Sequence, residues 1–145
     1  MKGSDYAEIP AALRERIQDD PWVRTLGIRY LDLRRGYCRV SLALQPHMVN
    51  FQGYPHGGVI FSLADVAFVA ACNSHGESAV ALNMTISFLT AVPAGSRLVA
   101  EAREIKHGRR AGFYQVSVTS EVGALVAQVH CVAHRVPPSE VPGPE

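Results

Sequence analysis

Alternation of apolar and polar residues marks six stretches of the chain as β-strands. The predicted strands are Ile28–Leu33, Tyr37–Leu44, Ala79–Ala91, Arg97–Lys106, Gly112–Glu121 and Ala124–Val136. Gly36 separates the first two, which favours a hairpin, and short joints such as His107-Gly108 separate the later ones. Joints this short connect antiparallel neighbours, so we expect one antiparallel sheet.

One long segment, Gly57–Ser74, has the pattern of a buried helix. Two glycines open it, Gly76 can cap its end, and apolar residues surround it almost completely. A curved antiparallel sheet wrapped round this helix would cover it, which predicts an α+β fold with one long central helix. Small residues on the helix would let a second helix approach closely, so we also expect self-association into a dimer; they are Ala64, Ala67, Ala70 and Ala71.

The two ends of the chain have a different character. Pro10 can open a short helix, Ala11–Asp19, and we expect Pro21 to end it. We interpret residues 1–135 as a single domain in which residues 1–24 form an N-terminal helical extension. Four prolines between residues 136 and 145 predict a disordered tail.

Charge and cysteine content narrow the function. The chain has 145 residues, of which 14 are basic and 13 acidic, so its net charge is +1. This charge produces no strong positive electrostatic field that would attract nucleic acid or an anionic membrane. Its longest apolar run is too short to cross a bilayer. Three cysteines, far apart in sequence, form no disulfide framework and no zinc pattern. We therefore expect a cytoplasmic protein that binds neither nucleic acid nor membrane.

Asp65 is the one charged residue inside the apolar helix. Burying a carboxylate costs several kcal/mol unless it is paired or protonated, and aspartate is a poor residue for a helix interior. Two interpretations of Asp65 are possible. Asp65 either lies on a narrow solvated stripe or makes a structural hydrogen bond, or it is a functional acid.

The turn His56-Gly57-Gly58 is the second candidate feature. Free backbone N–H groups at a helix start favour a negative charge or an oxygen that becomes negative. Asp65 follows Gly57 by eight residues, about 12 Å along a helix, so one small reacting group cannot touch both in one chain. Two antiparallel helices related by a two-fold axis would bring Gly57 of one chain toward Asp65 of the other. Such a composite site suits acyl transfer without a serine triad and needs no metal or cofactor.

The run Asn50-Phe51-Gln52-Gly53-Tyr54-Pro55-His56-Gly57-Gly58, continuing to Leu63-Ala64-Asp65, resembles the hotdog-fold acyl-CoA thioesterases of the phenylacetate-pathway (PaaI) subfamily. The resemblance extends through Thr85-Ile86-Ser87-Phe88-Leu89 and Lys106-His107-Gly108-Arg109 to about residue 135. It implies a hotdog fold, a thioester hydrolase and a homodimer that assembles into a tetramer. It also implies aromatic substrates such as phenylacetyl- or hydroxyphenylacetyl-CoA; medium-chain acyl groups stay open.

The resemblance assigns roles residue by residue. Asp65 is the general base or the nucleophile, and the Gly57 N–H polarises the thioester carbonyl. Asn50 orients the carboxylate or the water, and His56 shapes the turn and can contact the thioester side. Ala81 stands where some relatives hold the water with a serine, so that role is either empty or filled by Asn83 or Thr85.

Substrate contacts are expected from two further groups. An aromatic or medium-chain acyl pocket would be lined by Phe61, Phe68, Tyr54 and Leu63, and Gly58 and Asn83 are further expected substrate contacts. The basic segment that contains Arg109 and Arg110 would hold the phosphates of CoA, although an ordinary solvated turn explains it equally well.

The sequence supports two alternative functions less well than thioester hydrolysis. A hotdog dehydratase or hydratase needs a second proton-transfer group, often a histidine five residues after the aspartate, where this chain has Ala70. A non-catalytic acyl-CoA sensor has no need for a carboxylate on an apolar helix. His130 and His134 share a strand face but lack an evident third ligand, so we expect no metal.

Overall fold

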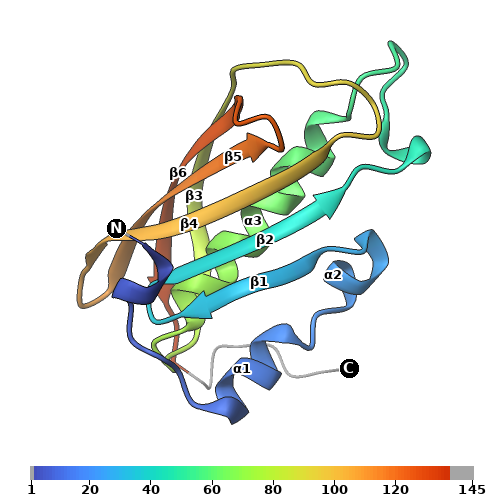
Figure 1. Cartoon of the computed structure of the whole chain (residues 1–145). Coiled ribbons are helices and arrows are strands. Elements are labelled where there is room, and N and C mark those ends of the chain that lie inside the picture. The colour runs from blue at the N-terminus through green and yellow to red at the C-terminus, as the bar shows by residue number, and fades with distance from the viewer. Residues whose placement is uncertain (1, 138–145) are drawn as a thin grey trace.

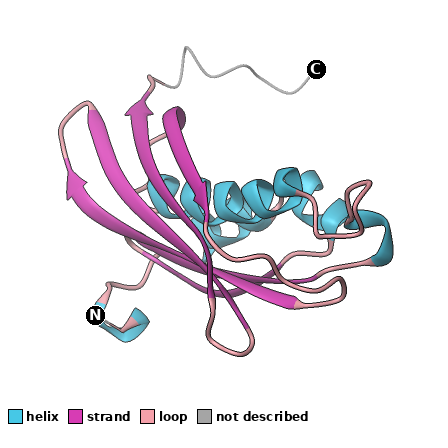
Figure 2. Ribbon diagram, turned by 90° about the horizontal axis from the view of Figure 1, so that it is seen from above, coloured by secondary structure: helices cyan, strands magenta, loops and turns pink. Residues whose placement is uncertain are grey.

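The computed structural model describes residues 2–137, and it confirms an antiparallel sheet around one long helix (Figure 1). The strands run in the order β1-β2-β4-β5-β6-β3, and every neighbouring pair is antiparallel. Seen from above, the sheet curves along the central helix (Figure 2). The strands are β1 (Arg29–Arg34), β2 (Tyr37–Ala43), β3 (Ala79–Phe88), β4 (Arg97–His107), β5 (Ala111–Ser120) and β6 (Leu125–Arg135).

The central helix, α3, spans Gly57–Asn73, one residue less than the sequence predicts. Its buried face packs on the sheet and builds the core together with inward-facing residues of β2, β4, β5 and β6. The opposite face leaves a stripe that is only partly covered, with residues three or four positions apart on one side of the helix. We call these residues the open stripe of α3: Gly58, Ser62, Asp65, Val69 and Asn73.

The alanines of α3 correct one expectation. Ala64, Ala67, Ala70 and Ala71 are 0–2% exposed and belong to the core under the sheet. Small residues here let the helix lie close to its own sheet, and they are not available to a second helix. A partner that approaches α3 would meet the open stripe.

Strand β3 lies at one edge of the sheet and pairs with β6 alone. It ends at Phe88, three residues earlier than predicted, because the N–H groups of Leu89 and Thr90 turn to the Val126 carbonyl. Much of the strand is open to solvent, including Leu82, which is 66% exposed at an irregularity in the register. An edge strand with exposed apolar side chains is a surface that proteins ordinarily cover.

Two helices precede the sheet: α1 (Ala11–Gln18) and α2 (Pro21–Leu26). Pro21 does follow the end of α1, but it also opens α2, a helix that the sequence analysis missed. Asp20 caps α2 by accepting from the N–H groups of Trp22 and Val23, and proline is favoured at the first helical position. Two short 3-10 turns complete the helical segments, η1 (Gly3–Asp5) and η2 (Pro46–Met48).

Within residues 2–137, no helix combines the length and apolarity needed to cross a membrane. The predicted disordered tail, 136–145, lies almost entirely outside the described residues.

Candidate active site

The start of α3 presents a free backbone donor. His56 is the N-cap, and its Nδ1 accepts from the Gly58 N–H at 3.2 Å. The His56 N–H in turn donates to the Met48 carbonyl at 2.8 Å, which fixes the turn. Gly57 occupies the first helical position, and its N–H donates to no group within the described part of the chain. Gly58 is therefore engaged in capping, whereas the Gly57 N–H remains available to a ligand oxygen at the positive end of the helix.

A cavity of about 330 Å³ opens beside Gly57. The loop before α3 forms one wall with Tyr54 and Pro55, and the segment after β3 forms the other with Leu89–Val92. Phe88 is its aromatic wall, and a methyl group added to Gly57 would lie 3.3 Å from the tip of that ring. This volume and apolar lining suit a small acyl group next to a hydrogen-bond donor.

Asp65 lies in the middle of the open stripe and is partly buried. Between residues 2 and 137, no side chain or N–H group pairs with its carboxylate. Burial raises the pKa of Asp65 above its usual range, and the negative charge of Asp20 raises it further. A carboxylate that is partly desolvated and has no partner is costly for folding and is suited to accepting a proton.

Gly57 and Asp65 do not share a cavity within one chain. They are eight residues apart on the same helix, about 12 Å along its axis. The cavity beside Gly57 is lined by residues of the first helical turn and of the β3–β4 connection, and Asp65 is absent from its walls. One chain therefore holds the donor and the acid at separate places.

Asn50 organises the loop before α3. Its Oδ1 accepts from the N–H groups of Gln52 at 2.9 Å and Tyr54 at 3.2 Å, and its N–H donates to the Tyr54 carbonyl at 2.7 Å. In the single chain the Asn50 side chain thus holds the loop that forms one cavity wall. The structure does not bring Asn50 to Asp65 of the same chain.

The predicted acyl-pocket residues fall in three different places. Phe61 is partly buried on α3. Phe68 is 0% exposed and packs against Tyr114 with ring centroids 5.6 Å apart, so the expectation that it lines a pocket is corrected to a core role. Asn83 pairs with Val132, next to the buried Cys131, and alternation therefore puts it on the face of the sheet away from α3. Thr85 lies on that same outer face and donates to Asn83 at 3.4 Å.

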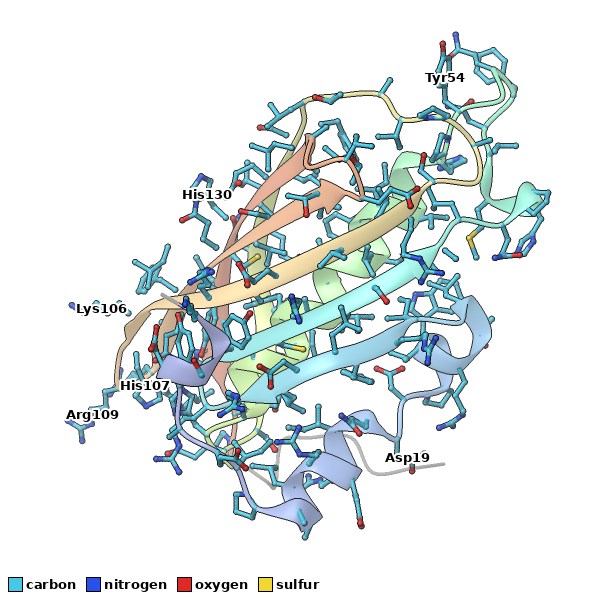
Figure 3. All side chains as sticks on the ribbon, in the orientation of Figure 1. Asp19, Tyr54, Lys106, His107, Arg109 and His130 are labelled. Atoms are coloured by element: carbon cyan, nitrogen blue, oxygen red, sulfur yellow. The ribbon has the colours of Figure 1, made fainter. Side chains whose placement is uncertain are left out.

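Arg109 and Arg110 lie in the turn between β4 and β5, far from Gly57. Figure 3 shows Tyr54, near the start of α3, and Arg109 at opposite ends of the molecule. The two arginines are exposed and line a hollow of about 290 Å³ with Arg135, Glu77 and Ser78. A basic hollow of this kind suits a phosphate group, although it lies at the far end of α3 within one chain.

Sequence reasoning missed the wall formed by Phe88 and residues 89–92. All of them except Val92 fall within the strand predicted over Ala79–Ala91, and their alternation gives no sign that the chain leaves the sheet after Phe88. Pro93 was the available signal, because proline disfavours continued strand pairing.

Comparison with known proteins identifies the family of the chain. The model of the thioesterase superfamily matches residues 52–127, which include both Gly57 and Asp65. The acyl-coenzyme A thioesterase PaaI of Escherichia coli is 35% identical over 119 residues, which cover 82% of this chain and 85% of that protein. The structure of that PaaI protein, from the phenylacetic acid degradation operon, superposes with a TM-score of 0.82 at 34% identity and covers 86% of this chain and 90% of the other.

A Streptococcus mutans protein solved with bound acetyl-CoA has a TM-score of 0.73 at 26% identity, covering 75% of this chain and 88% of that one. The six antiparallel strands around one central helix are therefore the hotdog arrangement of the PaaI structures. On the family match and these relatives, the chain belongs to the thioesterase superfamily and is a hotdog-fold thioester hydrolase related to PaaI.

Proposed function

We propose that this enzyme hydrolyses acyl-CoA thioesters to the free acid and CoA, at two composite sites in a homodimer. One observation carries the proposal: the Gly57 N–H and the Asp65 carboxylate, neither of which has a partner among residues 2–137, lie on one helix but eight residues apart. A two-fold axis that passes beside Phe61, halfway between these two residues on α3, would bring Gly57 of the partner subunit to Asp65. Each site would then have a donor for the carbonyl oxygen and an acid beside the carbonyl carbon.

The surface for this dimer is the open stripe of α3 together with the free edge of β3. Leu82 and Val80 are exposed apolar residues on that edge. Burial of such a strand edge against its twin supplies hydrogen-bond partners to its backbone and removes apolar surface from water. The tetramer implied by the resemblance stays a prediction.

The chemistry needs no metal or cofactor, because CoA is part of the substrate and two protein groups divide the work. As the attacking oxygen forms its bond to the thioester carbon, the carbonyl oxygen gains negative charge, which the Gly57 N–H and the helix N-terminus stabilise. Asp65 either removes a proton from the attacking water or attacks directly to form an anhydride that water then opens. In both routes the C–S bond breaks and the thiolate of CoA leaves.

The proposed acyl pocket is the cavity beside Gly57. Phe88 and Tyr54 give it aromatic walls, which supports phenylacetyl-type substrates, while its apolar lining also admits a medium-length acyl chain. Arg109 and Arg110 are proposed to hold phosphates of CoA. They lie beyond the C-terminal end of α3, on the side that a partner's Gly57 would approach in the antiparallel dimer.

We also propose a cytoplasmic location. The three cysteines are buried free thiols, as expected for a reducing compartment.

The test is complementation between two inactive variants. Asp65→Asn removes the acid, and Gly57→Pro removes the N–H at a helical position that accepts proline. Gly57→Ala, which keeps the N–H, is the matched control. Release of free thiol from phenylacetyl-CoA and from a medium-chain acyl-CoA is measured for each variant alone and after the two inactive ones are unfolded and refolded together.

In a shared site, a mixed dimer has one intact centre, which pairs Asp65 of the proline variant with Gly57 of the asparagine variant. Random mixing should then restore about a quarter of wild-type activity. Recovery of no activity, with mixed dimers demonstrated by mass spectrometry, would show that each centre lies within one chain and would reject the proposal.

A further inference from the structure

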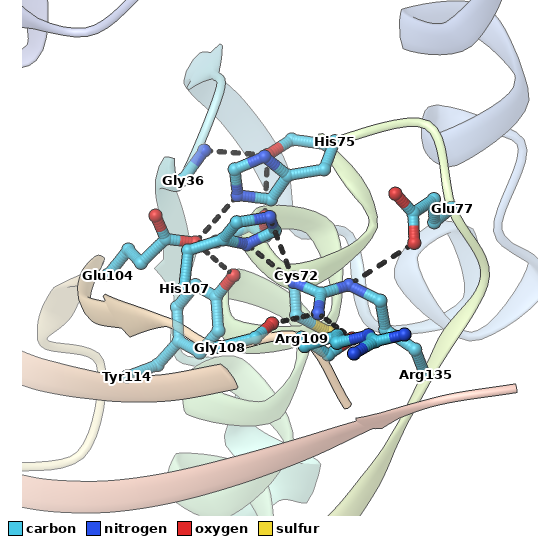
Figure 4. A network of polar contacts seen from close by, with 12 residues as sticks. Gly36, Cys72, His75, Glu77, Glu104, His107, Gly108, Arg109, Tyr114 and Arg135 are labelled. Atoms are coloured by element: carbon cyan, nitrogen blue, oxygen red, sulfur yellow. Dashed lines mark hydrogen bonds and ion pairs between the residues drawn. The ribbon is translucent and has the colours of Figure 1, made fainter. Parts of the chain in front are cut away.

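Three side chains that commonly bind metals meet near the C-terminal end of α3, outside the proposed thioesterase centre. His75 comes from the α3–β3 connection, and Glu104 and His107 come from the end of β4 (Figure 4). One ligand atom of each lies within 4.8 Å of the others. His75 Nε2 is 2.6 Å from Glu104 Oε2, and His107 Nδ1 is 3.5 Å from the same oxygen. The two imidazole rings stack with centroids 3.8 Å apart.

We propose that His75, Glu104 and His107 bind one divalent transition-metal ion of the zinc or cobalt kind. Two imidazoles and one carboxylate are a donor set that such ions accept, with a fourth position left for water. The ion would replace the hydrogen that His75 and Glu104 now share, and the proton would leave to solvent because a ligating imidazole must offer its lone pair. No electron transfer is involved.

The carboxylate is already held in place for this role. Tyr114 is buried on β5, and its hydroxyl donates to Glu104 Oε2 at 2.6 Å. The Glu104 N–H donates to the Gly36 carbonyl at 2.9 Å, which fixes the backbone from the other side. Supporting hydrogen bonds of this kind orient metal ligands and typically change metal affinity by about 10–100-fold when removed.

Arg135 is the cation that faces the cluster. Its guanidinium donates to His107 Nδ1 and to the Arg109 carbonyl, and its Nε lies 3.4 Å from Glu77 Oε2. Its positive charge opposes a bound ion, and its Nη2 lies within hydrogen-bond distance of both ring nitrogens of His107, so His107 must release Arg135 to bind the ion. Replacement of Arg135 by glutamine should therefore tighten metal binding, which a merely structural network of hydrogen bonds does not predict.

A bound ion would join two parts of the chain that lie far apart in sequence. It would tie the connection after α3 to the β4–β5 turn, which carries Arg109 and Arg110. The inference does not depend on the proposed catalytic site, since none of the three ligands lies in the cavity beside Gly57.

The test is a titration of the full chain, first stripped with a chelator, with Zn²⁺ by calorimetry and with Co²⁺ by absorption. We expect one ion per chain. His107→Gln and Glu104→Gln should weaken binding by more than about 100-fold, Tyr114→Phe by about 10-fold, and Arg135→Gln should strengthen it. His130→Gln, at an exposed histidine on the outer face of the sheet, is the matched control and should bind as the wild type does.

A second measurement uses the unaltered protein, so that misfolding of a variant cannot decide the outcome. Among the six histidines, the ring NMR signals of His75 and His107 should shift when Zn²⁺ is added. Shifts confined to His130 and His134, or equal Zn²⁺ affinity in wild type and in well-folded Glu104→Gln, would overturn the site. Thiol release is not used as a readout, so failure here and failure of the proposed function are distinguishable.

Discussion

Substitution of Asp65 by asparagine is the most informative single change in this enzyme. It keeps the shape of the side chain and removes the charge and the proton-accepting oxygen. General base catalysis by a positioned group contributes about 10²–10⁴-fold, which corresponds to about 3–5 kcal/mol of transition-state stabilisation. We expect kcat/KM for acyl-CoA hydrolysis to fall by that factor.

The same substitution should leave the fold intact or stabilise it. Asp65 has no partner among residues 2–137, and burial is the main cause of its raised pKa. A carboxyl with a raised pKa in the folded state binds its proton more tightly there, so it costs stability once it ionises. Removing the charge should remove that cost at neutral pH.

The sign of this effect can be checked against pH. Wild-type stability falls as the pH rises from the ordinary aspartate pKa through the raised pKa of Asp65, because the unfolded chain releases the proton first. The asparagine variant lacks this fall. The difference in the free energy of unfolding should therefore be small in acid, grow through that window and stay constant above it. Wild-type kcat/KM should have its acid limb at the same raised pKa, since only ionised Asp65 accepts a proton.

The assays are thiol release for activity and urea unfolding at several pH values for stability. Asp19→Asn provides the matched control, because it makes the same chemical change at an exposed side chain that forms a surface ion pair with Arg24. Near-normal activity of Asp65→Asn would refute the assigned role. A large loss of stability would refute the conclusion that the carboxylate is unsupported, and would make Asp65 a structural residue.

Three other predictions address the rest of the site. Gly57→Ala should lower activity on aromatic acyl-CoA by roughly 10-fold, because the added methyl group, 3.3 Å from the Phe88 ring, crowds the cavity. Adding Phe88→Leu should restore the activity. Steady-state kinetics of the single and double variants test this prediction. Arg109→Ala with Arg110→Ala should raise KM about 10-fold with little change in kcat, and the effect should shrink in high salt if the guanidinium groups contact phosphates. Leu82→Asp should shift the enzyme toward monomers in analytical ultracentrifugation and abolish its activity, because an acidic residue on the β3 edge opposes pairing of two copies. A fully active monomer would contradict the composite site.

Much of the architecture could be predicted from periodicity, because the side-chain pattern of a strand or of a buried helix is a local property. The six strands and α3 all follow from it to within a few residues. Asp65 and Gly57 could be singled out as candidate site residues for the same reason, since a lone acid in an apolar helix and a glycine pair at its start are visible without coordinates. Pro21 shows the limit of prediction from local pattern. A proline at this position fits both the end of one helix and the beginning of the next, and the capping of α2 by Asp20 is what shows that a second helix begins here.

Tertiary structure alone decided which face of α3 each residue occupies. An almost uniformly apolar helix has no periodicity to orient it, so Phe68 and the alanines of α3 could not be distinguished in advance from pocket or interface residues; packing against the curved sheet placed them in the core. Likewise, His75 and Glu104 are 29 residues apart, and they meet because β4 returns past the end of α3. The local pattern determines which elements form and which residues carry chemistry, whereas the contacts between distant segments arise only when the sheet closes around the helix.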